Sequence, residues 1–385
     1  MEQTERYIDK LAKYILLASG TALIGALCWY FKSVIIYILA AVVVSLIAKP
    51  LMVQMQKIRI KGHKAPDWFL AAFTLSTVII VLLSVITLII PIVSGILKGI
   101  SLSSIENAAG QISVPLANLN EFLRNTFPQL GQEFRIEMAL IEQIQKLFDV
   151  SIISSVIGSA TSFLTSFGRG LFSVVFIGFF FIKDDGLFTK IICALVPDKH
   201  EKTTEKAISD IGNLLSRYFI GVVIEVLGVT VVNFLGLWLI ARLGVNASLA
   251  IAFMTGIFNI IPYVGPLLGG ALGTVLGLLL KYSSATPVGL DIGFWGFAAV
   301  LIAIFCFTQL IDNFLYQPVI YSTSIKSKPL EIFIVLLIVG HIGGPLAMIA
   351  AIPLYTVVRV IAFRFFRNVK AIRKLIPSEK LISDD

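Results

Sequence analysis

Residues 259–266 read Asn-Ile-Ile-Pro-Tyr-Val-Gly-Pro and interrupt a run of apolar residues that extends from 247 to 281. Proline removes a backbone donor and clashes with the preceding helical turn, whereas glycine permits a sharp change of direction. A second apolar run, 330–362, is interrupted in the same way at 340–345, which read Gly-His-Ile-Gly-Gly-Pro. We therefore predict that a helix breaks at each of these two places.

The composition indicates what surrounds these breaks. Hydrophobic residues make up 57% of the 385 residues and charged residues only 14%, whereas a soluble domain carries about 25% charged residues. This balance predicts an all-α polytopic membrane protein, in which each spanning helix needs about 20 mainly apolar residues. About eight hydrophobic segments fit that description, at 11–31, 34–48, 68–91, 162–182, 219–241, 247–281, 293–313 and 330–362.

Basic residues predict which side of the membrane each segment faces, because cytoplasmic loops are enriched in Lys and Arg. The 49–66 loop contains five basic and no acidic residues, and the tail from 359 contains seven basic and three acidic residues. Segment 92–150 contains four basic and six acidic residues, which fits the opposite side. We expect the amino and carboxyl termini to be cytoplasmic, with 11–31 and 34–48 forming a helical hairpin.

The same features divide the chain into six parts. They are amino-terminal transmembrane helices one to three (1–91), an extracytoplasmic amphipathic segment (92–150), transmembrane helix four (151–182), a cytoplasmic or interfacial helix (183–218), a module with broken helices (219–362) and a basic cytoplasmic tail (363–385). Segment 92–150 fits helices packed on the outer membrane face, or a cap that captures substrate or a partner.

Two interpretations of the module with broken helices remain open, and they differ in the number of complete spans. If runs 247–281 and 330–362 cross the membrane despite their breaks, the chain has eight spans. If each run is a re-entrant helical hairpin, six full spans remain, and 219–281 and 293–362 form an inverted repeat. We favour the hairpins because their legs are short, and inverted repeats of broken helices are typical of secondary transporters. Simple kinks in a helix bundle are the alternative.

Backbone N–H and C=O groups that lack helical hydrogen bonds within the membrane are tolerated only inside the protein or beside a water-filled cavity. We therefore expect both breaks to lie in the interior of the protein, where it performs its function. Polar residues on the apolar runs extend this prediction, because ionisable groups within the membrane usually face the bundle interior. Asp312 shares a helix face with Gln309 and Asn313, although capping of the helix end would also explain it. Glu225 and His341 could bind a proton or an ion, and a paired carboxylate or a structural histidine are the respective alternatives.

The candidate residues form three groups. The predicted substrate or ion pathway comprises Asn259, Pro262, Tyr263, Gly265, Pro266, Gln309, Asp312, Asn313, Gln317 and Pro318; the predicted proton- or ion-coupling residues are Glu225, Asp312 and His341; and the predicted hinge comprises Gly340, Gly343, Gly344 and Pro345.

Motifs for catalysis are missing from the sequence. It contains no phosphate-binding Gly-x-x-x-x-Gly-Lys-Ser/Thr loop, no HExxH zinc motif and no Gly-x-Ser-x-Gly elbow, so we expect no ATP motor, no enzyme activity, no catalytic residue, no metal and no cofactor. Cys28, Cys193 and Cys306 show no metal-ligand spacing. The net charge of +8 collects in short loops between apolar runs, which indicates a lipid bilayer as the partner and not a nucleic acid.

The sequence resembles a known family. IPYVGP at 261–266, DNFLYQP at 312–318 and the segment SKPLEIFIVLLIVGHIGGPLAMIAAIPLYTVVRV from 327 are similar to motifs of the autoinducer-2 exporter (PerM-like permease) family of bacterial membrane proteins. The resemblance covers most of the chain and is most specific over 210–360. Two positions depart from the family pattern: Val222, where many members carry Gln, and Lys328, where many carry His.

This resemblance implies a secondary transporter or exporter of small molecules, of the autoinducer-2 type or similar, in the bacterial inner membrane. It also implies a homo-oligomer. A sodium(lithium)/proton antiporter and a passive, channel-like permease are the alternatives. Proton or sodium coupling and alternating access are further expectations.

Overall fold

The computed structural model describes residues 25–57, 59–60, 63–99, 170–184, 186–283, 288–320 and 329–366, with a few short stretches near 14–23 and 117–126. Most of the predicted outer segment 92–150 and of the tail 363–385 lies outside these residues. The chain forms two compact units, Met1–Thr77 with Leu164–Phe188 and Val78–Phe163 with Thr189–Asp385.

The first unit is built from helices that meet through small residues. It contains α2 (Lys32–Gln56), the start of α3 (Asp67–Gly99) and a helix at Gly170–Lys183. A Cβ atom on Gly170 would lie 2.8 Å from the Tyr37 ring, so glycine allows these helices to approach closely. Two short antiparallel strands, β1 (Arg59–Ile60) and β2 (His63–Lys64), form a hairpin within the basic loop.

The expected helical hairpin of 11–31 and 34–48 is not what the structure shows. Helical hydrogen bonds run across the expected turn, from the Phe31 amide to the Leu27 carbonyl at 2.9 Å and from the Ile35 amide to the Phe31 carbonyl at 3.1 Å. No glycine or proline lies between residues 27 and 49. The chain therefore has no residue there that forces a reversal, and only one non-helical residue, Phe31, separates the preceding helical turn from α2.

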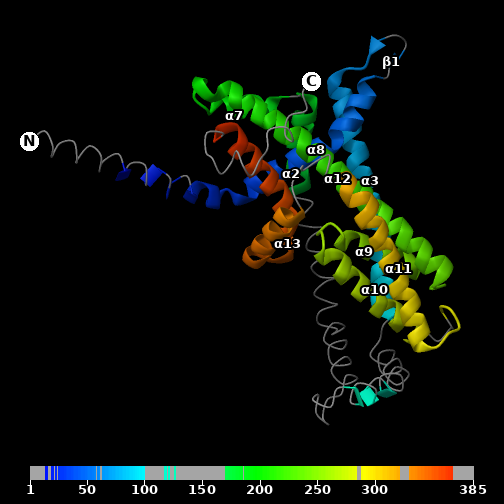
Figure 1. Ribbon diagram of the computed structural model, residues 1–385. Coiled ribbons are helices and arrows are strands. Elements are labelled where there is room, and N and C mark those ends of the chain that lie inside the picture. The colour runs from blue at the N-terminus through cyan, green and yellow to red at the C-terminus, as the bar shows by residue number, and fades with distance from the viewer. Residues whose placement is uncertain are drawn as a thin grey trace, which may run out of the picture. The chain divides into compact units, whose positions relative to one another are not determined.

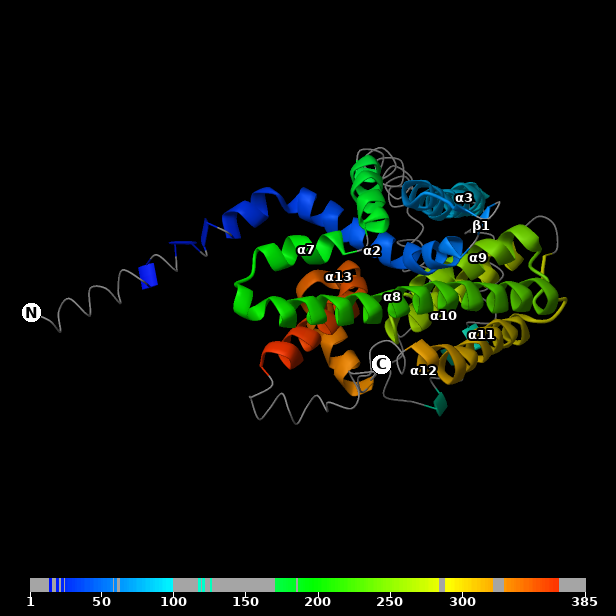
Figure 2. The same ribbon diagram turned by 90° about the horizontal axis from the view of Figure 1, so that it is seen from above.

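The second unit is organised around one long helix. After α7 (Leu187–Ala194), α8 runs from Asp198 to Leu235 and continues as a π-helical turn, η2 (Gly236–Ile240). The expected boundary at 218 marks a change from polar to apolar composition, and the helix runs through it. Figures 1 and 2 show α8 lying along α9, α11 and α12, with α13 beside its amino-terminal half.

Helices α9 (Val245–Phe258) and α10 (Val264–Ser283) form an antiparallel pair joined at the predicted break. A Cβ on Gly265 would lie 1.8 Å from the Phe258 carbonyl oxygen, and one on Gly269 would lie 3.3 Å from the Thr255 backbone. Helix α10 therefore packs on α9 through glycines spaced four residues apart, as small residues do in membrane helix pairs.

The next helix runs antiparallel to α8. It comprises α11 (Phe294–Ile311), a π-helical turn η3 (Asp312–Tyr316) and α12 (Gln317–Ile320). Three glycines of α8 lie against its side chains: Gly221 against Ile320, Gly228 against Tyr316 and Gly236 against Ile304.

Helix α13 (Pro329–Phe365) reverses direction at Gly344, whose φ of 68° and ψ of −166° are not helical. The Tyr355 hydroxyl donates to Glu331 Oε2 at 2.7 Å. In a straight helix these residues would be about 36 Å apart. The residues before and after Gly344 are therefore the two antiparallel legs of a helical hairpin.

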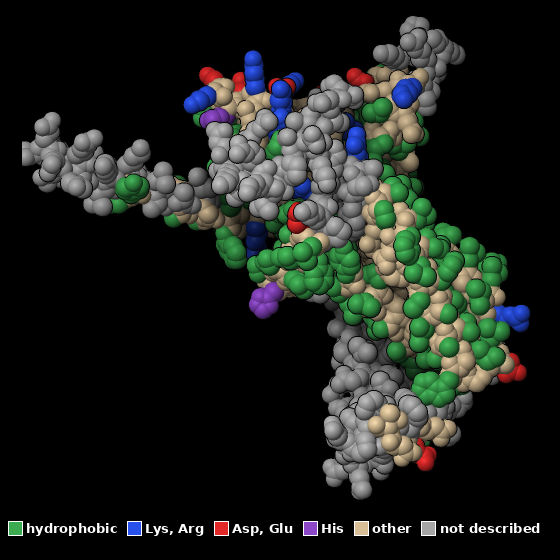
Figure 3. All heavy atoms as spheres, viewed as in Figure 1, with side chains coloured by type: hydrophobic (Ala, Val, Ile, Leu, Met, Phe, Trp, Pro, Cys, Tyr) green, Lys and Arg blue, Asp and Glu red, His purple; other side chains and the backbone are tan. Residues whose placement is uncertain are grey.

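Five helices of the described chain are long and apolar enough to cross a membrane: Lys32–Gln56, Asp198–Ile240, Val264–Tyr282, Phe294–Ile320 and Ala347–Phe365. Four shorter apolar helices accompany them, at Asp67–Val81, Gly170–Lys183, Val245–Phe258 and Leu330–Gly344. In Figure 3 the surface around α9 to α12 is mainly hydrophobic, with few charged side chains. The protein is a helical membrane protein, and the number of complete spans stays a prediction.

Candidate functional site

A layer of acid and amide side chains lies buried where α8, the end of α9 and η3 meet. Glu225 of α8 is 4% exposed, Asn259 at the end of α9 is 3% exposed, and Asp312 at the start of η3 is fully buried. Asn259 Nδ2 donates to Glu225 Oε1 at 3.0 Å. The Glu225 and Asp312 carboxyl groups lie next to each other. We call these three residues, with Gln309 and Gln317, the acid–amide layer.

Two glutamines complete this layer. Gln317 Nε2 donates to Asp312 Oδ2 at 2.7 Å, and Gln309 Nε2 lies 3.3 Å from the same oxygen. Gln309 Nε2 also donates to Asn313 Oδ1 at 2.9 Å. The π-helical turn at 312–316 accompanies this arrangement, and such turns within α-helices are frequent at functional sites.

A second polar layer lies one helical turn away. Asn233 Nδ2 donates to Thr255 Oγ1 of α9 at 2.9 Å, and Thr308 Oγ1 of α11 donates to Asn233 Oδ1 at 2.6 Å. All three residues are less than 5% exposed. Because Thr255 and Thr308 each lie four residues before a member of the acid–amide layer, this clamp fixes the three helices that carry the layer.

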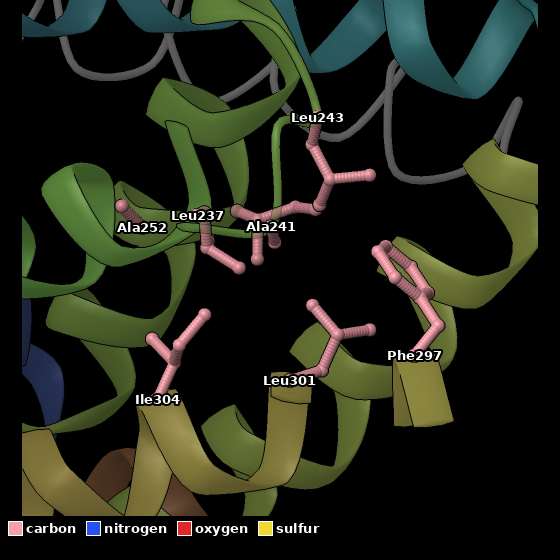
Figure 4. Packing of buried hydrophobic residues seen from close by; sticks show 8 residues of the cluster. Leu237, Ala241, Leu243, Ala252, Phe297, Leu301 and Ile304 are labelled. Atoms are coloured by element: carbon pink, nitrogen blue, oxygen red, sulfur yellow. The ribbon is translucent and has the colours of Figure 1, made fainter. Parts of the chain in front are cut away.

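Hydrophobic clusters close both ends of this polar region. On one side Leu237, Leu243, Ile251, Phe297 and Leu301, together with Ala241, Ala252 and Ile304, form a buried cluster, shown in Figure 4. We call it the α9–α11 cluster.

On the other side Tyr218, Ile320, Ile332, Leu336, Ala351 and Ile352 form a second cluster, which we call the α13 cluster. Along α8, α9 and α11–α12, the polar residues lie between the members of the two clusters. Glu225, Asn259, Asp312 and Gln317 are therefore buried between the two clusters, and Gln309 lies partly exposed at the edge of the layer.

The first break places the tip of the α9–α10 hairpin against the α13 cluster. Tyr263 adopts a φ of 65°, which is rare for a bulky residue, and its ring packs against Phe333 at a centroid distance of 5.8 Å. Pro262 and Gly265 are buried, and Pro266 is partly buried. These residues shape the turn, while Asn259 alone of this stretch hydrogen-bonds to the carboxyl groups.

The other predicted residues lie further from the layer. Asn313 and Pro318 are exposed, although Asn313 accepts the Gln309 amide. His341 is exposed near the turn of α13 and is not among the groups that act on either carboxyl. Of the predicted hinge, Gly344 makes the reversal, Gly340 faces Met348 across the two legs, and Gly343 lies beside Ala347; the side chain of Pro345 is outside the described set.

The sequence interpretation missed Thr255 and Thr308 as members of the site. Their signal was spacing: each lies four residues before a predicted pathway residue, Asn259 and Asp312 respectively, and so on the same helix face. Both hydroxyls also lie within hydrogen-bonding distance of a carbonyl of their own helix, Ala252 at 2.8 Å and Ile304 at 3.0 Å. Threonine in an apolar helix is commonly satisfied in that way, which hides an interhelical role.

Broken helices around a buried acid–amide layer, in a chain of apolar helices, define a polytopic membrane protein with a polar interior. The comparisons with known proteins agree. The model of the family described as AI-2E family transporter matches residues 19–366, and the chain belongs to this family.

Two relatives come from Bacillus subtilis (strain 168). "Putative transport protein YueF" is 30% identical over 247 residues, which cover 64% of this chain and 61% of that protein. "Putative transport protein YrrI" is 25% identical over 195 residues, which cover 51% of each. The matched part of this chain thus spans less than two thirds of either relative. Membership of a transporter family is consistent with a protein that is not an enzyme.

Proposed function

We propose that this chain is a secondary transporter that exports a small molecule, of the autoinducer-2 type or similar, across the bacterial inner membrane. The observation that carries the proposal is the enclosed acid–amide layer at the break between α9 and α10. Burying two carboxyl groups and two amides in a hydrophobic protein is costly, and packing alone gives no reason for it. The family supports transport as the reason.

We propose alternating access as the mechanism. The buried members of the α9–α11 cluster come from η2, the residues just after it, α9 and α11, and the Asn233 clamp ties α8, α9 and α11 together. The α13 cluster instead joins α8 and α12 to both legs of the α13 hairpin. We therefore expect the layer to open first on the α13 side, by movement of that hairpin about Gly344 against Tyr263.

A wider set of expectations goes with this mechanism. The two hairpins would be re-entrant and related as inverted repeats, both termini would be cytoplasmic, and the protein would be a homo-oligomer whose transport is coupled to an ion. The lengths of two hairpin legs support the first point: Val245–Phe258 and Leu330–Gly344 hold 14 and 15 residues, or about 21–23 Å of helix against a hydrocarbon core of about 30 Å.

Counterflow of labelled autoinducer-2 in proteoliposomes tests the function. We expect saturable flux that unlabelled autoinducer-2 on the opposite side accelerates, and at least a tenfold loss in the Asn259→Ala and Asp312→Ala variants. The exposed Asn313→Ala variant is the control and should retain most of the flux. Flux that neither saturates nor exchanges would contradict the carrier and favour a channel-like permease.

A sodium(lithium)/proton antiporter is the competing function. It predicts no autoinducer-2 counterflow but proton movement out of the vesicles when sodium or lithium chloride is added outside. A pH-sensitive dye trapped in the same vesicles distinguishes the two functions, because autoinducer-2 counterflow without a cation response excludes this alternative.

A further inference from the structure

The two oxygens of Asp312 have different surroundings. Oδ2 accepts the Gln317 amide and lies within reach of the Gln309 amide. Oδ1 is buried and receives no N–H or hydroxyl donor. A buried acceptor without a donor is destabilising, and Asp312 is fully buried. The donor to Oδ1 of Asp312 is therefore neither an amide nor the hydroxyl of a Ser, Thr or Tyr side chain.

The Glu225 carboxyl and the Asn259 amide are the other groups that act on Asp312, and no N–H of Asn259 bonds to Oδ1. Glu225 Oε1 accepts the Asn259 amide, which leaves its second oxygen for the contact. Tyr218, seven residues or about two helical turns earlier on α8, is the other titratable group that Glu225 influences. Among the described residues, no Lys, Arg or His acts on either carboxyl.

We propose that Glu225 and Asp312 share one exchangeable proton, which Glu225 carries and donates to Oδ1 of Asp312. Two adjacent carboxylates without a cation repel each other strongly in a buried site, and such pairs retain one proton. Asp312 is the ionised partner because its other oxygen accepts amide donors. Glu225 is the protonated partner because its carboxyl accepts a single amide, from Asn259, whereas Oδ2 of Asp312 is reached by two amides.

The role of this proton in transport rests on the proposed function. While the layer is enclosed, the O–H bond on Glu225 stays intact, since a dianion would be unsolvated. When the layer opens, the O–H bond breaks, the proton passes to water, and the entering water solvates both carboxylates. Closure requires that the pair takes up a proton again, so each cycle would carry one proton.

Infrared spectroscopy of the purified full-length protein tests the proposal without any transport assay. In a detergent without ester groups near neutral pH, we expect a carbonyl-stretch band from one protonated carboxyl that shifts in D2O. The Glu225→Gln variant should lose the band. The Glu331→Gln variant is the matched control and should keep it, because Glu331 lies outside the acid–amide layer and bonds to the Tyr355 hydroxyl. A wild-type protein without the band, or a band that persists in Glu225→Gln, would overturn the proposal.

Thermal unfolding tests which residue carries the proton. Glutamine at 225 can still donate an N–H to Asp312, so Glu225→Gln should shift the unfolding temperature by about 2 °C or less. Asparagine at 312 would turn an N–H2 group toward the amides of Gln317 and Gln309, so Asp312→Asn should lower it by about 5 °C or more. The reverse order would overturn the assignment to Glu225.

The two proposals fail separately. Autoinducer-2 counterflow by a protein without the infrared band would overturn the shared proton and leave the transporter intact. The band in a protein that gives no counterflow would support the shared proton and contradict the transport function.

Discussion

Single residues decide how the polar interior holds together, and Asn233 is the clearest case. Its amide bonds to hydroxyls on two different helices, Thr255 of α9 and Thr308 of α11. Interhelical hydrogen bonds in membrane proteins contribute about 0.6 kcal/mol on average and up to about 1.7 kcal/mol. We therefore predict that Asn233→Leu, which preserves volume, lowers the free energy of unfolding by about 1–2 kcal/mol in a denaturant titration.

Thr356→Val is the matched control for this prediction. Thr356 is equally buried, but its hydroxyl bonds to the Ile352 carbonyl of its own helix, so its replacement should cost less than about 0.5 kcal/mol. Equal losses in the two variants would show that Asn233 does not link the helices.

The sequence predicted some residues of the site and not others, for a physical reason. Glu225, Asn259 and Asp312 stand out because charged and amide side chains are expensive in an apolar helix. Thr255 and Thr308 do not, since a threonine can satisfy its own hydroxyl within a helix. His341 drew attention because a titratable side chain at a turn is conspicuous in sequence, while its exposure depends on how the α13 hairpin packs. Its coupling role stays a prediction.

At the scale of elements, the turn between α9 and α10 depends on close backbone contact at Gly265. A Cβ there would lie 1.8 Å from the Phe258 carbonyl oxygen and 3.1 Å from the Asn259 Cα, and neither backbone atom can move without opening the turn. We predict that Gly265→Ala abolishes the monodisperse peak of purified protein in size-exclusion chromatography. Gly293→Ala, where a Cβ meets nothing within 4 Å, should behave as wild type. Loss of the monodisperse peak in both variants would show that the backbone contact at Gly265 is not the cause.

The reversal of α13 gives a second element-scale prediction. Spin labels at the exposed positions 334 and 354 would be about 30 Å apart along a straight helix. The hairpin predicts a distance well below that value in pulsed electron paramagnetic resonance. Gly344→Ala should broaden or lengthen the distribution, because the backbone conformation at 344 is essentially restricted to glycine and costs any other residue about 1–3 kcal/mol. A single distance near 30 Å in the unsubstituted backbone would contradict the hairpin.

Sequence patterns located the elements of the second unit better than those of the first. Glycine and proline mark both reversals, at 259–266 and 340–345, because they change the backbone itself. The turn expected near residue 32 rested only on two polar residues, Lys32 and Ser33, between apolar runs. Polarity alone does not break a helix, so the hydrogen bonds continue across Phe31.

At the scale of the whole molecule, the account depends on the acid–amide layer becoming accessible from each side of the membrane in turn. Composition predicted a membrane protein, since apolar helices need lipid to cover their outward side chains. It could not predict that two hydrophobic clusters enclose the polar layer, because their members come from helices far apart in sequence.

Two-sided cysteine labelling at positions 259 and 317 tests this claim most directly. Both native side chains are buried, and Cys28, Cys193 and Cys306 can first be replaced by serine, with a cysteine at position 199, exposed in the polar first turn of α8, as the control for reagent access. We predict that a membrane-impermeant thiol reagent labels 259 and 317 from either side of oriented vesicles, and that added autoinducer-2 changes the ratio between the two sides. Labelling from one side only under every condition, or no labelling at either position, would contradict alternating access.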